Sequence, residues 1–98
     1  ANRIGEVLRL PAGSTWVKLR VINSDNYAEN GTEVAPDAYP IFVTILKRQI
    51  PHADIIQDEV TKLTNAIAAV CNRHPENIHV IYEPDGKGRI AFGGKIVE

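Results

Sequence analysis

A long amphipathic pattern occupies residues 54–72, in the second half of the chain. Apolar residues recur there at the intervals of one helical face: Ile56, Val60, Leu63, Ile67, Val70 and Cys71. Asp54 and Gln57 have the spacing of a capping box at the helix start. Pro75 disfavours helical geometry at the preceding residue, so the helix should end near Arg73. The pattern predicts one helix whose apolar face, the cysteine included, packs in the core.

Two strand-like runs flank this helix. "PIFVTIL" (40–46) precedes it and "NIHVIYE" (77–83) follows it, and both are rich in β-branched and aromatic residues. A strand, a helix and a second strand form a β-α-β unit, so we expect the two strands to be parallel, with a right-handed crossover.

The first forty residues carry weaker patterns. In "STWVKLRVI" (14–22), Val17, Leu19 and Val21 alternate with a tryptophan, a lysine and an arginine, which predicts a third strand with one apolar and one charged face. The opening residues resemble the last turns of a helix. The polar, turn-rich stretch 23–40 is typical of a hairpin tip followed by a connector.

Residues 86–94, "GKGRIAFGG", place four glycines around a short apolar run close to the end of the chain. A phosphate-binding loop normally joins a strand to a helix N-terminus, and only a few residues follow here. A short hairpin, whose glycines let the backbone of a neighbouring subunit come close, is therefore favoured.

Composition and charge narrow the class of protein. Ninety-eight residues with 44% hydrophobic and 23% charged side chains fit one globular domain. With eleven basic and twelve acidic residues, the chain lacks the excess of positive charge that is typical of proteins that bind nucleic acid or a membrane surface. A lone cysteine, no signal-peptide pattern and no apolar run of membrane-spanning length suggest a cytoplasmic protein. The three histidines lack the spacing of a metal site, so we expect no metal and no cofactor.

The chain also contains a faint internal repeat. "LPAGSTWVKLRVINSDNYAENG" aligns with "HPENIHVIYEPDGKGRIAFGG", and both combine a proline, a strand, a polar turn, a short apolar segment and a terminal glycine. Equivalent positions lie 63 residues apart: Trp16 with His79, Tyr27 with Ile90, and Gly31 with Gly94.

These segments resemble the tautomerase superfamily, that is, 4-oxalocrotonate tautomerase and proteins like macrophage migration inhibitory factor. Residues 40–97 resemble a complete β-α-β unit of that family, and residues 1–31 resemble the end of a preceding unit. The resemblance implies an α/β (α+β) fold in which helices back a four-stranded sheet. It also implies a homotrimer assembled through extended strands.

In that family an N-terminal proline acts as the general base, because a secondary amine can be tuned near neutrality. This chain begins with Ala1 at the apparent end of a helix, and the nitrogen of Pro40 is an amide that cannot act as a base. Two interpretations follow. Residues carrying the proline precede this chain, and the protein is an isomerase that moves a proton on a small 2-keto or enol carboxylate. Alternatively, it is a non-catalytic trimeric binding or scaffold protein of the same fold.

The resemblance also suggests site residues. The family's carboxylate-binding arginine is replaced here by Trp16 and, in the second unit, by His79, so Lys18 and Arg20 are candidates to bind the substrate carboxylate. The alternative for these two cations is a solvated strand face. His79 lies on a predicted strand and is a further candidate to face the pocket.

Tyr27 stands where the family has an aromatic wall residue, and its hydroxyl is a candidate donor to an enolate oxygen. Its alternative role is packing at a subunit interface. Ile90, the equivalent in the second unit, offers an apolar contact. Glu29 is a candidate to polarise water, as in hydratase-like and dehalogenase-like branches, or it belongs to a plain polar turn.

Overall fold

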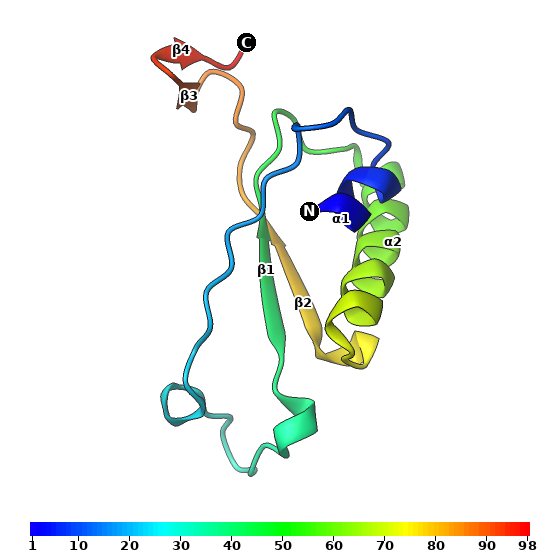
Figure 1. Cartoon of the computed structure of the whole chain (residues 1–98), viewed down its shortest axis with the longest axis vertical. Coiled ribbons are helices and arrows are strands. Elements are labelled where there is room, and N and C mark those ends of the chain that lie inside the picture. The colour runs from blue at the N-terminus through cyan, green and yellow to red at the C-terminus, as the bar shows by residue number, and fades with distance from the viewer.

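The computed structural model describes all residues from Ala1 to Glu98. The chain forms a small mixed α+β domain (Figure 1). Its helices and strands are α1 (Asn2–Val7), β1 (Ile41–Ile45), α2 (Ala53–Cys71), β2 (Ile78–Tyr82), β3 (Ala91–Phe92) and β4 (Lys95–Ile96). Three single-turn 3-10 helices complete them: η1 (Ser24–Asn26), η2 (Pro36–Ala38) and η3 (Pro75–Asn77). Neither α-helix has the combination of length and apolarity needed to span a membrane.

The second half of the chain is a β-α-β unit, as predicted. β1 and β2 pair in parallel, in a register that runs from Ile41 opposite Ile78 to Ile45 opposite Tyr82. α2 covers one face of this pair (Figure 1). Side chains therefore alternate between the helix and the open face, and Phe42 on β1 belongs to the open face.

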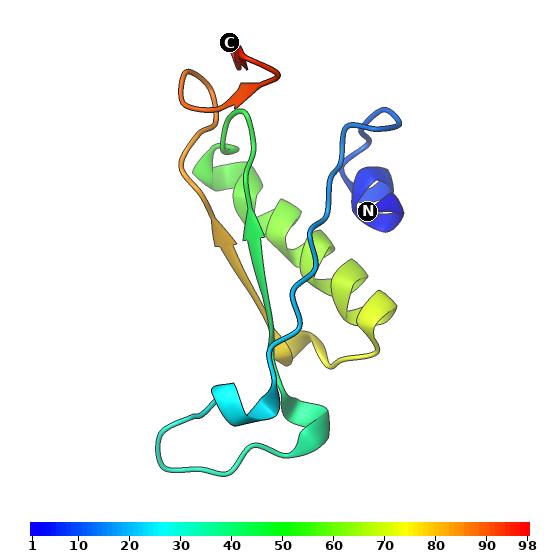
Figure 2. The same ribbon diagram turned by 60° about the vertical axis from the view of Figure 1, so that its left-hand side comes forward.

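The core lies between α2 and the two strands. Leu63 is fully buried, while Ile67 and Ala68 pack with Ile78 of β2. The short helix α1 lies beside α2, and its Ile4 packs against the same cluster (Figure 2). The strands and helices thus enclose a core of only a few side chains.

The predicted core face of α2 is wrong at its last turn. Val70 is 69% exposed, and Cys71 is exposed as well. The reason is that only two strands lie beneath the helix, so its last turn has no further strand to pack against.

The predicted capping box of α2 is also wrong. The helix begins at Ala53 with His52 as its N-cap, and no side chain caps it. The Gln57 amide instead donates to the Thr61 hydroxyl at 3.1 Å. At the other end Asn72 takes the left-handed conformation with φ of 53°, which ends the helix next to the predicted position.

The predicted third strand is not paired. No backbone hydrogen bond joins residues 15–22 to any other part of the chain. They run as a stretched-out segment beside β1 (Figures 1 and 2), and Leu19 and Val21 are 87% and 85% exposed. The expected four-stranded sheet is therefore not formed: the strands make two separate pairs, β1 with β2 and β3 with β4.

The glycine-rich stretch near the end forms the predicted hairpin. Ala91 pairs with Ile96 and Phe92 with Lys95 in antiparallel fashion. The connecting residues, Gly93 and Gly94, have φ of 57° and 83°, the two positive values that a tight type I′ turn requires. Further up the chain, the expected hairpin tip at 23–40 consists of η1, one isolated bridge and η2.

Candidate functional site

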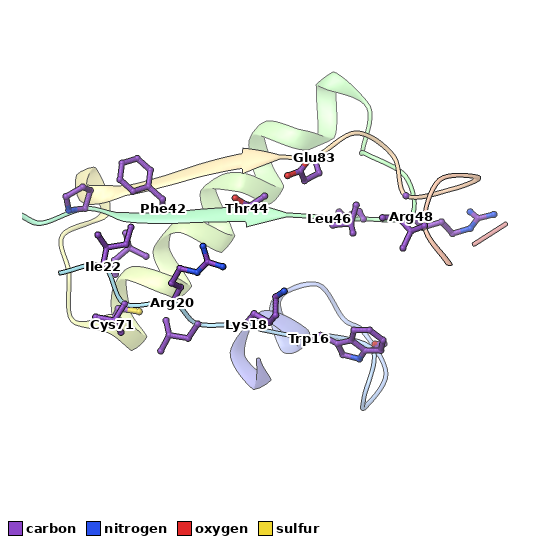
Figure 3. A pocket seen from close by; sticks show the side chains of 18 of the residues that line it. Trp16, Lys18, Arg20, Ile22, Phe42, Thr44, Leu46, Arg48, Cys71 and Glu83 are labelled. Atoms are coloured by element: carbon purple, nitrogen blue, oxygen red, sulfur yellow. The ribbon is translucent and has the colours of Figure 1, made fainter. Parts of the chain in front are cut away.

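The main cavity is an open groove of about 1550 Å³ between the unpaired segment and β1. Residues 13–24 form one wall, and β1 with the residues that follow it, up to Arg48, forms the other. Figure 3 shows Lys18 and Arg20 reaching from the first wall towards Thr44 and Leu46 on the second. The groove exists because the first wall follows the direction of a strand without pairing to β1.

The groove is rich in positive charge. Six cationic residues line it against a single carboxylate, Glu83; they are Lys18, Arg20, Lys47, Arg48, Arg73 and Arg89. The whole chain, in contrast, has eleven basic and twelve acidic residues. The groove therefore concentrates cations that the composition alone does not reveal, and it favours an anionic ligand.

Several of these cations are already engaged. Lys47 forms an ion pair with Glu59, with 2.8 Å between Nζ and Oε2. Arg48 donates to the carbonyl of Glu98, and Arg89 donates to two backbone carbonyls of its own turn. Lys18 and Arg20 take part in none of the chain's ion pairs. They are the two groove cations best placed to bind an added carboxylate.

An aromatic group closes one end of the groove. The ring centroid of Tyr27 lies 5.9 Å from that of Tyr39 and 6.2 Å from that of Phe42. The Tyr27 hydroxyl donates to Glu29 Oε2 at 2.6 Å. This hydrogen bond, followed by desolvation, raises the pKa of Tyr27 above its usual value. The phenol therefore keeps its proton and donates a hydrogen bond to Glu29.

A second aromatic pair lies at the opposite end. Trp16 and Phe92 meet edge to face, with ring centroids 5.0 Å apart. The Trp16 indole N–H donates to the carbonyl of Gly13 at 2.9 Å, which fixes the ring at the start of the unpaired segment. The contact joins this segment to the β3–β4 hairpin.

The structure gathers four of the six candidate site residues along the groove. Lys18, Arg20, Tyr27 and Ile90 line it. Glu29 lies outside the lining and reaches the site only through its hydrogen bond with Tyr27. His79 also lies outside the lining: it is exposed on β2, with its ring 5.4 Å from that of Phe42.

Sequence reasoning missed the residues of the second wall. Phe42, Thr44 and Leu46 line the groove from alternate positions along β1 and just beyond it. Their period of two was available in the sequence, and it places them on the face opposite the helix. The sequence does not show, however, that this face of β1 lines a groove.

A second polar cluster lies outside the groove proper. Glu59 of α2 accepts from Lys47 and, at 2.8 Å, from the Tyr82 hydroxyl at the end of β2. Burial, and then the bond to Glu59, raise the pKa of Tyr82 well above its usual value. The three side chains tie the helix to both strands, which gives them a structural role.

No cluster of three His, Cys, Asp or Glu side chains has the arrangement of a metal site. A comparison of the chain with models of known protein families and with characterised proteins finds no match.

Proposed function

We propose that the groove binds a small 2-keto or enol carboxylate and supports a tautomerase-type proton transfer on it. The observation that carries this proposal is the pair Lys18 and Arg20, two cations without an ion-pair partner on one wall of a groove with aromatic side chains at its ends. A carboxylate binds to such cations through charge-assisted hydrogen bonds. The resemblance to the tautomerase superfamily supports the same substrate class.

Each groove residue has a role in this proposal. Lys18 and Arg20 hold the carboxylate, and the Tyr27 ring covers the apolar part of the substrate. Ile90 adds an apolar contact at the hairpin end of the groove. Because the Tyr27 hydroxyl already donates to Glu29 and its pKa is raised, the phenol lines the groove as an aromatic wall and does not release its proton.

The proton itself must be moved by a base. The family's base is the secondary amine of an N-terminal proline, which takes a proton from a carbon next to a carbonyl and returns it elsewhere. Pro40, a groove residue, is an internal proline and its amide nitrogen has no basic lone pair. The proposal therefore assigns the base to a terminal proline brought to the groove, a residue outside positions 1–98.

The proposed assembly is a homotrimer. β1 and residues 15–22 each present unpaired backbone, and Phe42 and Ile81 leave apolar surface on the open face of the sheet. Exposed edges and apolar patches of this kind are usually covered by another subunit. Light scattering at micromolar concentration tests the assembly, and a stable monomer would contradict it.

Enzyme kinetics test the reaction. A chain with a strand of the tautomerase type joined before Ala1, starting with an exposed proline, should convert an enol-pyruvate substrate, and the 98-residue chain should not. In the active form, Lys18→Ala or Arg20→Ala should mainly raise KM, because a carboxylate is held equally in the ground and transition states. Equal turnover by the 98-residue chain after acetylation of its terminus would refute the mechanism.

The second candidate is a non-catalytic binding protein of the same fold. The groove's cations, together with a phenol whose hydroxyl is already hydrogen-bonded to Glu29, favour binding over proton transfer within residues 1–98. Saturable binding of a 2-keto acid, lost in Lys18→Gln and without turnover in either form of the chain, would support this candidate.

A further inference from the structure

We propose that Asn30 is a site of spontaneous covalent modification, at which the peptide nitrogen of Gly31 attacks the side-chain amide and converts Asn30 into aspartate and isoaspartate. This proposal goes beyond the proposed function and does not depend on it, because it concerns the loop between η1 and η2. The loop lies at the end of the molecule far from the β3–β4 hairpin (Figure 1).

The reaction needs no partner other than water. The nitrogen of Gly31 forms a bond to Cγ of Asn30, the bond from Cγ to Nδ2 breaks, and ammonia leaves with the proton of the Gly31 amide. The product is a cyclic imide, a succinimide. Water then opens the ring at either carbonyl carbon: one opening gives aspartate, and the other gives isoaspartate, in which the backbone runs through the former side chain.

The sequence provides the reactive dipeptide once. Of the chain's seven asparagines, only Asn30 precedes a glycine. A Cβ on the following residue crowds the nitrogen that has to attack, and glycine has none. Glycine also lets the backbone rotate more freely into the conformation that brings this nitrogen towards Cγ.

The structure leaves this dipeptide free to react. Asn30 and Gly31 form an exposed turn, bracketed by the bridge between Glu29 and Thr32. Gly31 has φ of 75°, and no neighbouring atom lies within 4 Å of the position where a Cβ would stand. Neither the Asn30 side chain nor the Gly31 N–H takes part in a hydrogen bond, so no such contact has to break before the nitrogen approaches Cγ.

A second dipeptide shows how the fold can prevent the reaction. Asp85 precedes Gly86, and this pair would form the same cyclic imide with loss of water. There the Ile50 N–H donates to Oδ1 of Asp85 at 2.7 Å, and the Gly86 N–H donates to the carbonyl of Lys47 at 2.8 Å. The attacking nitrogen and the carboxylate are both held in place, so this pair should remain unmodified.

Modification would change the loop in two ways. Residues 23–40 contain four carboxylates and no lysine or arginine, and conversion of Asn30 adds one more negative charge next to Glu29. Isoaspartate also lengthens the backbone by one methylene between Glu29 and Thr32, which disrupts the pairing of these two residues. The modified position is thus adjacent to the carboxylate that accepts the Tyr27 hydrogen bond.

Peptide mapping of the full 98-residue chain tests the proposal. After incubation at neutral pH and physiological temperature, trypsin releases residues 21–47, and mass-spectrometric fragmentation assigns any deamidation to Asn23, Asn26 or Asn30. We expect deamidation at Asn30 to be at least about tenfold faster than at the other two, a difference of about 1.4 kcal/mol in activation free energy. An isoaspartate-specific methyltransferase should label this peptide and not the one that contains Asp85.

Variants of the chain sharpen the test. Gly31→Ala hinders the attacking nitrogen and should slow deamidation at Asn30 at least about tenfold. Asn30→Gln should leave this position unmodified over the same time, because its longer side chain would have to close a larger ring. Gly13→Ala is the matched control: it places the same side chain at another glycine with positive φ, 79°, and open surroundings, and it should leave the rate at Asn30 unchanged.

Three results would overturn the proposal. The first is a rate at Asn30 that falls short of the tenfold margin over Asn23 and Asn26. The second is an unchanged rate in Gly31→Ala. The third is a rate in the folded chain more than about tenfold below that in a synthetic peptide of residues 25–36, because the fold would then hold the dipeptide in an unreactive arrangement.

Discussion

Leu63 is the side chain on which the small core depends most, and its replacement by alanine has a predictable cost. It is 0% exposed and is the only large side chain that is completely enclosed. Complete burial of a leucine contributes about 1.5–3 kcal/mol relative to water, and Leu→Ala substitutions in cores cost about 2–5 kcal/mol with the cavity included. A core of so few residues can collapse around the deletion, so we expect about 2–3 kcal/mol, at the low end of that range.

Urea unfolding followed by far-UV circular dichroism measures this loss, because α2 supplies most of the helical signal. Val70→Ala is the matched control on the same helix. Val70 is largely exposed, and alanine forms helix better than a β-branched residue, so this variant should lie between no change and a gain of about 0.5 kcal/mol. The reasoning is refuted if Leu63→Ala costs less than about 0.5 kcal/mol or if the two variants lose equal stability.

Three further predictions concern local features. The raised pKa of Tyr82 means that the folded chain keeps this phenol proton at pH values where the unfolded chain loses it. The free energy of unfolding should therefore fall as the pH rises above about 10. In urea unfolding, Tyr82→Phe should show a smaller fall over the same pH range. Glu29→Gln replaces the carboxylate whose hydrogen bond is the main cause of the raised pKa of Tyr27, so ultraviolet titration of the tyrosines should show this phenol ionising at lower pH; an unchanged titration would contradict the assignment. Gly94→Ala forces a side chain onto a backbone with φ of 83°, which should destabilise the hairpin by about 1–2 kcal/mol. Amide hydrogen exchange should therefore become faster in β3 and β4 and stay unchanged in α2.

The elements that depend on local pattern could be predicted from the sequence. The helical spacing gave α2 to within about one residue at either end. Strand composition located β1 and β2, and the glycine-rich stretch 86–94 indicated the final hairpin. In each case the determining interactions lie within a few residues or within one β-α-β unit.

The predictions were wrong where the structure of a segment depends on contacts with residues far away in the sequence. The alternation of Val17, Leu19 and Val21 shows that residues 15–22 are suited to a strand, but it cannot show whether an edge is available to pair with. The exposure of Val70 has a similar cause, since only two strands lie beneath the helix and no third strand covers this part of its apolar face.

The candidate site divides in the same way. Lys18 and Arg20 were identifiable as charged neighbours on one face of the segment, whereas Tyr27 was suggested only by the family resemblance. Phe42 and Arg48 were not identifiable, because they join the groove only once β1 lies opposite that segment. The surplus of positive charge in the groove is likewise a property of the folded arrangement.

The unpaired segment also determines where a protease should first cut the chain. Proteases require an extended, solvated backbone, and residues 15–22 combine this with two trypsin sites, Lys18 and Arg20. A cut there separates α1 from the β-α-β unit along the chain but leaves its contact with α2 in place, since Ile4 packs against the core. The nicked protein would then be two fragments held together by the packing of α1 on α2 and by the contact of Trp16 with Phe92, and the fragments should separate on dilution.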